Sequence, residues 1–371
     1  MDFDFSEEQL QLREACAKWV SKACGFERRR QTVAAGGHDP GAYRALADLG
    51  LTGLCIAGEH GGMDMGPVEA MIVMEEMGRG LVLAPLGNTF AVSKVLTHFA
   101  TTEQQTRWLP KVASGDCLAV VAHQERAARY RLDRCETEAT EQAGQWRLNG
   151  AKHLVPAADH ADAFLLPATT PTGLRLFWVE RQAAGLHTSG YPTQDGARAG
   201  DLHLANAPAT LVTTNGLNAL ALAADTALAA LCAEAVGVME TTLALTVDYM
   251  NTRKQFGVPI ASFQALRHRV ADMKMQLELA RSMSYYASLK LNAPAPERRL
   301  AVARAKVQLG QSMRFVGQQA VQLHGGIGVT DEYIISHCFK KLTQLEMSWG
   351  DTLHHLGALS AGMQDTAGVF A

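Results

Sequence analysis

The chain has 371 residues, of which 47% are apolar and 19% charged, a composition typical of a folded protein with two or three domains. The formal net charge of −3, with no basic run longer than Arg28–Arg30, excludes the charge pattern of a nucleic-acid or anionic-membrane binder. The acidic start "MDFDFSEEQL", the lack of an apolar run expected to span a bilayer, and seven scattered cysteines predict a cytoplasmic protein with reduced thiols and no bound metal.

The first part of the chain, residues 1–116, is predicted to be a helical domain. Ser6 followed by Gln9 has the form of a capping box, and apolar residues then recur at helical spacing as far as Ala23. Further helices are expected over "DPGAYRALADLGL", from Pro67 onward, and over "TEQQTRWLPKVASGD".

The middle part, residues 117–212, has a different pattern. The segments "CLAVVAHQE", "WRLNGAKHLV", "ADAFLLPA" and "LRLFWVE" are short, rich in strand-forming residues and separated by turn residues. No helical pattern lies between them, so we expect an antiparallel β-barrel or sandwich.

The last part, residues 213–371, returns to the helical period. Four long segments, about 217–254, 262–291, 296–323 and 331–366, are joined by short connections and predict a four-helix bundle. The expected fold class is therefore multi-domain α+β, with a helical domain, a β domain and a helical bundle in that order.

Two stretches of the bundle are candidate ligand-binding motifs. "QLHGGIGVTDE" holds three glycines, which allow close backbone approach to a ligand, although a turn that simply ends a helix explains them as well. In "NTRKQFGVPIASFQ", Arg253 is suited to a diphosphate, Gln255 to a base or ribose, and Phe256 to a ring. The alternatives are a cation that complements a helix C-terminus and an aromatic core anchor.

Together these two stretches resemble the signatures of the acyl-CoA dehydrogenase family, and the resemblance extends over essentially the whole chain. "YMNTRKQFGVPIASFQALRHRVADM" and "AVQLHGGIGVT" look like its two C-terminal signatures. Within the family, "VAHQERAARY", "SGYPTQDG" and "FKKLTQLEMSWGDTLHHL" look most like the small subunit of bacterial pimeloyl-CoA dehydrogenase.

The resemblance implies an FAD cofactor, an acyl-CoA substrate, and an electron-transfer flavoprotein or other acceptor. It places FAD between the β-barrel and the bundle. It also implies that several residues of the bundle contact an FAD molecule that is bound mainly by a neighbouring subunit. A homo- or hetero-oligomer, a dimer or tetramer, would then complete the cofactor site. The residues implied are Arg253, Gln255, Phe256, Gln322, Gly325 and Gly326.

The reaction of the family needs one carboxylate that removes the α proton while the β hydrogen leaves as hydride to the flavin. Most members carry this glutamate in a sequence such as Tyr-Glu-Gly-Thr, where this chain has Trp349, Gly350, Asp351 and Thr352. Some relatives carry it on the first bundle helix, but that position falls near Ala227 here. The usual base is therefore absent.

Asp351 is the nearest acid and our candidate base, although a helix cap explains an aspartate at this place equally well. Glu346 and Glu125 are weaker candidates. Thr352 is expected to contact the cofactor. The neighbouring His354 and His355 point about 100° apart on a helix, so they are not expected to chelate one metal ion.

The barrel also departs from the family pattern. Relatives read Lys-x-Trp-Ile-Thr beside the flavin ring, whereas "KHLVP" places Leu154 and Pro156 there, and Gln124 replaces a threonine or serine directed at the flavin. Arg126, Arg129 and Arg131 follow, either as receptors for a distal carboxylate or as a solvated strand edge.

Three functions remain open on these grounds. The chain is a complete acyl-CoA dehydrogenase for a medium-chain or dicarboxylic substrate, or a subunit that contributes FAD contacts while a partner holds the glutamate, or a binding protein without turnover.

Overall fold

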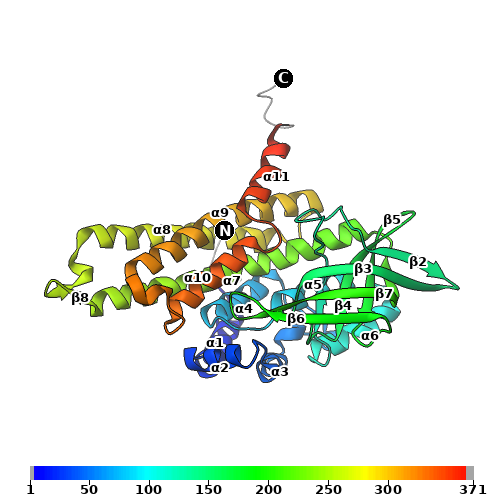
Figure 1. The fold of residues 1–371 in the computed structure, drawn as a ribbon, viewed down its shortest axis with the longest axis horizontal. Coiled ribbons are helices and arrows are strands. Elements are labelled where there is room, and N and C mark those ends of the chain that lie inside the picture. Colours follow the sequence, from blue (N-terminus) through cyan, green and yellow to red (C-terminus); the bar gives the residue numbers. More distant parts are fainter. Residues whose placement is uncertain (1–3, 365–371) are drawn as a thin grey trace. The chain divides into compact units, whose positions relative to one another are not determined.

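The computed structural model describes residues 4–364 (Figure 1). The chain divides into two compact units. The first unit contains the described residues up to Arg29, Pro67–Val82, and the chain from Leu228 onward. The second contains Arg30–Gly66 and Leu83–Ala227. Each unit therefore draws on more than one of the three consecutive sequence ranges.

The N-terminal part is helical, and its helices begin where the sequence provides caps. Ser6 and Gln9 form the expected capping box, Asp39 caps the helix that starts at Pro40, and Thr101 with Gln104 forms a second capping box. Two helices were missing from the sequence prediction, α2 and α5. The helices are α1 (Glu7–Ala23), α2 (Phe26–Ala34), α3 (Pro40–Asp48), α4 (Pro67–Arg79), α5 (Leu86–Phe99) and α6 (Thr102–Ala113), with short 3₁₀ turns η1 (Leu51–Gly53) and η2 (Gly58–His60).

The middle part is a closed β-barrel. Strands β4, β2, β3, β7 and β5 pair in that order, and β5 pairs again with β4, while β1 joins β4 and β6 joins β7. The strands are β1 (Ala119–Val121), β2 (Glu138–Gln142), β3 (Gln145–Pro156), β4 (Ala163–Thr170), β5 (Gly173–Glu180), β6 (Leu186–Pro192) and β7 (Arg198–Thr213).

The sequence pattern predicts an antiparallel barrel, but two of the strand pairs are parallel. β1 runs parallel to β4, and β2 meets β4 in a parallel contact at Glu138 and Thr169. The reason is that a long loop, residues 122–137, joins β1 to β2, so no tight hairpin fixes the direction of β1, whereas β2 continues into β3 through the two-residue turn Ala143–Gly144. The remaining pairs are antiparallel.

Alternating side chains of the strands fill the barrel interior, with Phe164, Leu166, Phe177 and Val179 fully buried. Lys152 of β3 lies among them without any exposed surface. Strand β3 is interrupted by a register shift between Lys152 and Val155, where Leu154 adopts a left-handed φ of 52°.

The described part of the C-terminal region, as far as residue 364, contains five α-helices, where the sequence predicted four. They are α7 (Gly216–Thr252), α8 (Gln264–Lys290), α9 (Ala295–His324), α10 (Ile334–Met347) and α11 (Thr352–Gln364). A two-stranded hairpin, β8 (Lys254–Gln255) and β9 (Val258–Pro259), and the 3₁₀ turn η3 (Ile260–Ser262) follow α7, and η4 (Gly325–Val329) follows α9. The predicted fourth segment, 331–366, is broken at residues 348–351 because Trp349 and Gly350 have positive φ, which no α-helix accommodates.

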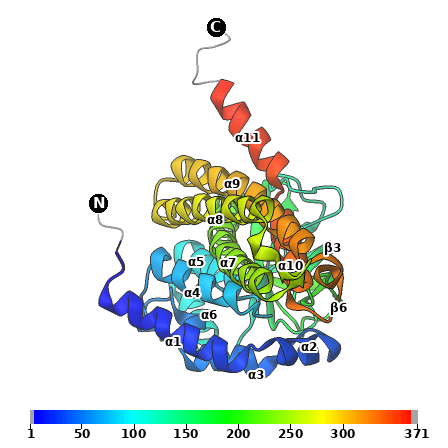
Figure 2. The same cartoon turned by 90° about the vertical axis from the view of Figure 1, so that its left-hand side faces the viewer.

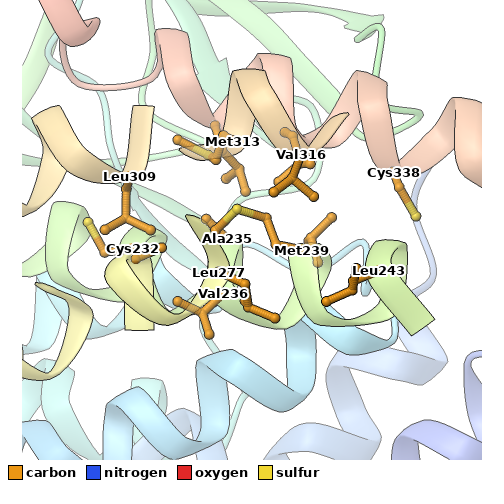
Figure 3. Packing of buried hydrophobic residues seen from close by; sticks show 14 of the residues in the cluster. Cys232, Ala235, Val236, Met239, Leu243, Leu277, Leu309, Met313, Val316 and Cys338 are labelled. Carbon is orange, nitrogen blue, oxygen red and sulfur yellow. The ribbon is translucent and has the colours of Figure 1, made fainter. Parts of the chain in front are cut away.

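The core of the bundle is a layer of apolar side chains between α7, α8, α9 and α10 (Figure 3). Met239, Leu277, Met313 and Val316 lie at its centre and are almost completely buried. Figure 2 shows α8 and α9 running side by side, with α11 projecting away from them.

Helix α7 is long and apolar enough to cross a membrane by composition alone, with a window of mean hydropathy 1.7. The expectation that no such run exists was therefore wrong. However, 94% of that window is buried inside the protein, so the apolar surface is covered by the rest of the chain.

Two glycines permit the close crossing of α4 and α7. A Cβ on Gly78 would lie 2.0 Å from the carbonyl oxygen of Glu234, and a Cβ on Gly237 would lie 1.9 Å from that of Glu75. Any larger residue would therefore force the two helices apart.

Candidate functional site

The turn between α10 and α11 is where the family motif places the catalytic glutamate. Asp351 immediately precedes α11, and its Oδ1 accepts a hydrogen bond of 2.8 Å from the backbone N–H of His354. The interpretation of Asp351 as a helix cap is thus confirmed. Its role as a base remains a prediction.

Gly350 has no room for a side chain. Its φ is 106°, and a Cβ built on it would lie 2.6 Å from Cδ2 of His354 and 2.7 Å from Nε2 of His355. The space next to this backbone is filled by two imidazoles. A glutamate here requires both strained backbone and displaced histidines.

His355 is buried and holds this turn in place. Its Nε2 lies 3.1 Å from the carbonyl oxygen of Trp349 and donates to it in the neutral ring. Burial, together with the nearby charge of Lys306, lowers the pKa of His355 to about 4.

Lys306 of α9 supports the same turn from beneath. Its buried Nζ donates to the carbonyl oxygens of Leu345, at 2.6 Å, and Ser348, at 3.0 Å, at the end of α10. Burial lowers the pKa of Lys306 to about 8. The sequence analysis missed this residue, although it lies on the apolar stripe of α9 formed by Val302 and Leu309, where a lysine calls for a buried acceptor.

The carboxylate of Glu346 stabilises the start of α11. Its Oε1 accepts hydrogen bonds from the N–H and the hydroxyl of Thr352, at 3.1 and 2.8 Å. Gly310 makes this approach possible, since a Cβ there would lie 2.0 Å from the hydroxyl oxygen of Thr352. The hydroxyl proton of Thr352 is therefore donated within the chain, and cofactor binding by Thr352 remains a prediction.

The β8–β9 hairpin presents the predicted cofactor residues to the surface. Phe256 and Gly257 form its two-residue turn, both with positive φ, and Phe256 is 92% exposed. Among the described residues, the side chains of Arg253 and Gln255 form no hydrogen bond or ion pair, and both are exposed. An exposed aromatic ring on a strained turn is poorly explained by the stability of this chain alone.

The glycine loop lies close to this hairpin because Tyr249 connects the two. The hydroxyl of Tyr249 donates to the carbonyl oxygen of His324 at 3.3 Å and its ring stacks on that of His324, while its carbonyl oxygen accepts from the N–H of Arg253. Gly325 has a φ of 64°, and a Cβ on Gly325 or Gly326 would meet nothing within 4 Å. The loop is thus open to an external group, and Gln322 next to it is exposed.

The barrel carries a separate cleft of about 360 Å³ beside β3. The predicted residue Gln124 lines it, as does Leu154, which is 52% exposed. The complete lining consists of Gln124, Glu125, Arg126, Arg129, Tyr130, His153, Leu154, Tyr191 and Asp201.

A polar cluster in this cleft was missed by the sequence analysis. Asp201 accepts a hydrogen bond of 2.9 Å from the hydroxyl of Tyr191, and its other oxygen lies 2.9 Å from Nδ1 of His153. Burial alone raises the pKa of Asp201, but the bonds to His153 and Tyr191 hold it below its usual range. No local motif joins these residues, which come from β3, β6 and β7 and meet only through the barrel register.

Glu125 is not available as a base. It forms a buried ion pair of 2.6 Å with Lys152 and also accepts from the hydroxyl of Thr137 at 2.7 Å and from the N–H of Glu136. Burial opposes its charge, yet Lys152 and these donors lower its pKa to about 2. A carboxylate with so low a pKa is a very weak base.

Comparison with known proteins identifies the chain. Residues 6–116 match the family model for the acyl-CoA dehydrogenase N-terminal domain, and residues 215–360 match that for the acyl-CoA dehydrogenase C-terminal domain. Acyl-CoA dehydrogenase IpdE2 of Mycobacterium tuberculosis is 31% identical over 337 residues, covering 90% of this chain and 91% of the relative. The chain belongs to the acyl-CoA dehydrogenase family.

Two further relatives agree with this assignment. L-prolyl-[peptidyl-carrier protein] dehydrogenase of Pseudomonas fluorescens is 30% identical over 356 residues, covering 90% of this chain and 92% of the relative. A chain in the crystal structure of the ChsE4-ChsE5 complex from Mycobacterium tuberculosis superposes with a TM-score of 0.91 at 26% identity, covering 99% of this chain and 100% of that chain. The predicted order of helical domain, β-barrel and helical bundle is thus confirmed as the acyl-CoA dehydrogenase fold.

The chemistry of an acyl-CoA dehydrogenase is the FAD-dependent dehydrogenation of acyl thioesters. The hairpin and glycine loop fit FAD, because they expose a guanidinium, an amide, an aromatic ring and an uncovered glycine backbone on one unit. The comparisons do not single out the pimeloyl-CoA dehydrogenase small subunit, so that finer resemblance remains a prediction.

Proposed function

We propose that this chain acts in an FAD-dependent acyl-CoA dehydrogenase as the subunit that contributes flavin contacts, while the proton-abstracting carboxylate belongs to a partner chain. The observation that carries this proposal is the closed space at Gly350, where a side chain would collide with His354 and His355. The relative solved as the ChsE4-ChsE5 complex, whose name joins two proteins, provides a precedent for two-component assembly.

The chain's own residues then serve to bind and orient. In this proposal Arg253 pairs with the diphosphate of FAD held by a neighbouring subunit, Gln255 hydrogen-bonds its base or ribose, and Phe256 packs on a ring. Bound FAD supplies a hydride acceptor for the β hydrogen of the thioester. The glycine backbone at Gly325 and Gly326 approaches the same cofactor, assisted by Gln322.

A second candidate is that this chain is a complete enzyme with Asp351 as its base. One observation favours it: the helix cap uses only Oδ1 of Asp351, and among the described residues Oδ2 forms no hydrogen bond. The short side chain then has to reach the α carbon from a position one residue beyond the usual glutamate.

The finer features of the function follow the family resemblance. We propose a medium-chain or dicarboxylic acyl group, as in fatty acid or dicarboxylate degradation, and an electron-transfer flavoprotein or a similar acceptor. A cytoplasmic location is supported by seven cysteines, none of which forms a disulfide. A protein that binds acyl-CoA or flavin without turnover is the remaining alternative.

The test is an anaerobic titration of the purified, FAD-loaded chain with pimeloyl-CoA and straight-chain acyl-CoAs, followed by flavin absorbance. We expect no bleaching by the chain alone, and bleaching once a larger homologous chain is added. The matched variant is Asp351→Asn, because asparagine caps a helix about as well as aspartate and removes only the basic carboxylate.

Each outcome separates the candidates. Bleaching by the chain alone that is lost in Asp351→Asn contradicts the two-chain proposal and makes Asp351 the base. Bleaching by the chain alone that persists in Asp351→Asn contradicts both assignments. A chain that binds FAD but never bleaches with any partner supports binding without turnover.

A further inference from the structure

The barrel cleft contains two arginines whose guanidinium groups form no hydrogen bond or ion pair within the described chain. We propose that Arg126 and Arg129 bind an oxyanion, a carboxylate or a phosphate, in this cleft. Both line the cleft, and among residues 4–364 neither guanidinium forms an ion pair or a hydrogen bond. A guanidinium presents several donors in a planar fork that matches either kind of oxyanion.

The neighbouring arginines of the same loop behave differently. Arg131 forms a two-point ion pair with Asp133, at 2.7 and 3.0 Å, and Arg134 lies 3.8 Å from Glu136. Neither of these arginines lines the cleft. The structure therefore divides the arginines that the sequence grouped together and leaves Arg126 and Arg129 facing the ligand space.

The charges that line the cleft are unequal in number. Glu125 is paired with the buried Lys152, which leaves the carboxylate of Asp201, bonded to His153 and Tyr191, beside the two arginines. One carboxylate therefore faces two guanidinium groups, and neither of them forms an ion pair with it. Tyr130 completes the polar lining.

The backbone around the cleft is strained at two places. Arg129 has a φ of 49° and Leu154 a φ of 52°, a region that side chains other than glycine seldom adopt. Strain of this kind collects at binding sites, where it fixes the direction of a side chain. Exposed Leu154 adds apolar surface beside the charges, so the expected ligand joins an oxyanion to an apolar or ring-shaped body.

Two sources supply such a group in an acyl-CoA dehydrogenase: the distal carboxylate of a dicarboxylic acyl chain, or a phosphate of the bound nucleotide. The first source rests on the proposed function, since it names a substrate class for the assembly. Binding measured without turnover keeps the two tests apart, because it does not depend on which chain carries the base.

The experiment is isothermal titration calorimetry of the full chain with pimelate and, separately, with inorganic pyrophosphate. The variants are Arg126→Gln and Arg129→Gly, the latter chosen because glycine accepts the positive φ and so protects the fold. We expect each to weaken binding of the preferred anion by about tenfold or more, the effect of losing a charge-assisted hydrogen bond. The matched control, Arg131→Gln, is expected to leave binding unchanged.

The two anions identify the source. Binding of pimelate that survives saturating FAD supports the acyl carboxylate, and binding of pyrophosphate that is abolished by FAD supports the nucleotide phosphate. Absence of binding for both anions overturns the proposal. Equal losses in Arg126→Gln and in the control Arg131→Gln also overturn it, because they indicate only a diffuse positive surface.

Discussion

The buried ion pair of Glu125 and Lys152 stabilises the wall of the barrel cleft and takes no part in its chemistry. Lys152 has no exposed surface, and Glu125 is 3% exposed, so each charge depends on the other for its solvation. Cys135 lies beside both, with its sulfur 3.3 Å from the carboxylate and 3.5 Å from the ammonium. The pair connects the loop before β2 to β3 and so fixes one wall of the cleft.

Replacing Glu125 with glutamine should destabilise the chain by about 3–5 kcal/mol, because Lys152 would remain buried without a counter-charge. Urea denaturation at pH 7 measures this loss. The control Asp133→Asn breaks a solvent-exposed ion pair and should leave the unfolding free energy nearly unchanged. Similar losses in both variants would show that Lys152 finds another partner.

The sequence contained part of this information. Leu148 and Lys152 share the inward face of β3, and an inward lysine in a strand indicates a buried acid somewhere in the fold. Which acid fills the role depends on contacts between residues 27 positions apart, as does the meeting of His153 with Asp201 across two strands. The sequence therefore identified candidate positions in the cleft but not their pairing.

At the scale of elements, the turn between α10 and α11 is maintained by groups from three helices. Lys306 holds the end of α10, Glu346 holds the start of α11, and His355 reaches back to Trp349. The apolar period of "LEMSWGDTLHHL" continues through this turn, which is why a single helix was predicted. The positive φ of Trp349 results from this tertiary support, and no local propensity indicates it.

We expect the contribution of this turn to the free energy of unfolding to decrease in mild acid. The pKa of His355 is about 4 in the folded chain, below its ordinary value of 6.5, so its contribution is fully present above pH 6.5 and is lost as the pH falls toward 4. The variant His355→Gln keeps a hydrogen-bond donor and removes the titration. Between pH 7 and pH 5 the wild-type chain should lose about 1–2 kcal/mol more unfolding free energy than this variant.

Urea denaturation at the two pH values tests the expectation, with His187→Gln on the exposed side of the barrel as control. Parallel pH dependence of the wild-type chain and His355→Gln would mean that His355 does not titrate in this range. A pH dependence that His187→Gln also removes would assign the effect to the unfolded chain.

At the scale of the whole molecule, the proposal that the exposed hairpin contacts FAD of a neighbouring subunit makes cofactor binding depend on the oligomer. Phe256→Ala should lower the FAD content of the purified oligomer several-fold without lowering the stability of the chain, because the ring is 92% exposed. Flavin absorbance per protein and thermal unfolding measure the two effects. The control is Leu10→Ala, another exposed apolar residue, on α1. Loss of stability in Phe256→Ala would instead make the ring part of the chain's own core.

The interleaved units also bear on how the protein is made. The unit that contains the bundle consists of the first helix of the chain, α4, and the residues from Leu228 onward. Its N-terminal and C-terminal segments must therefore pack together although the whole barrel segment separates them in the sequence. During synthesis α1 and α4 emerge from the ribosome long before α8 and α9. The apolar faces of α1 and α4 therefore stay exposed to solvent until the last helices have been synthesised. A nascent chain that ends before α10 thus has an incomplete apolar core, which chaperones and proteases are expected to bind. The barrel segment, in contrast, is continuous from Leu83 to Ala227 and can fold much earlier.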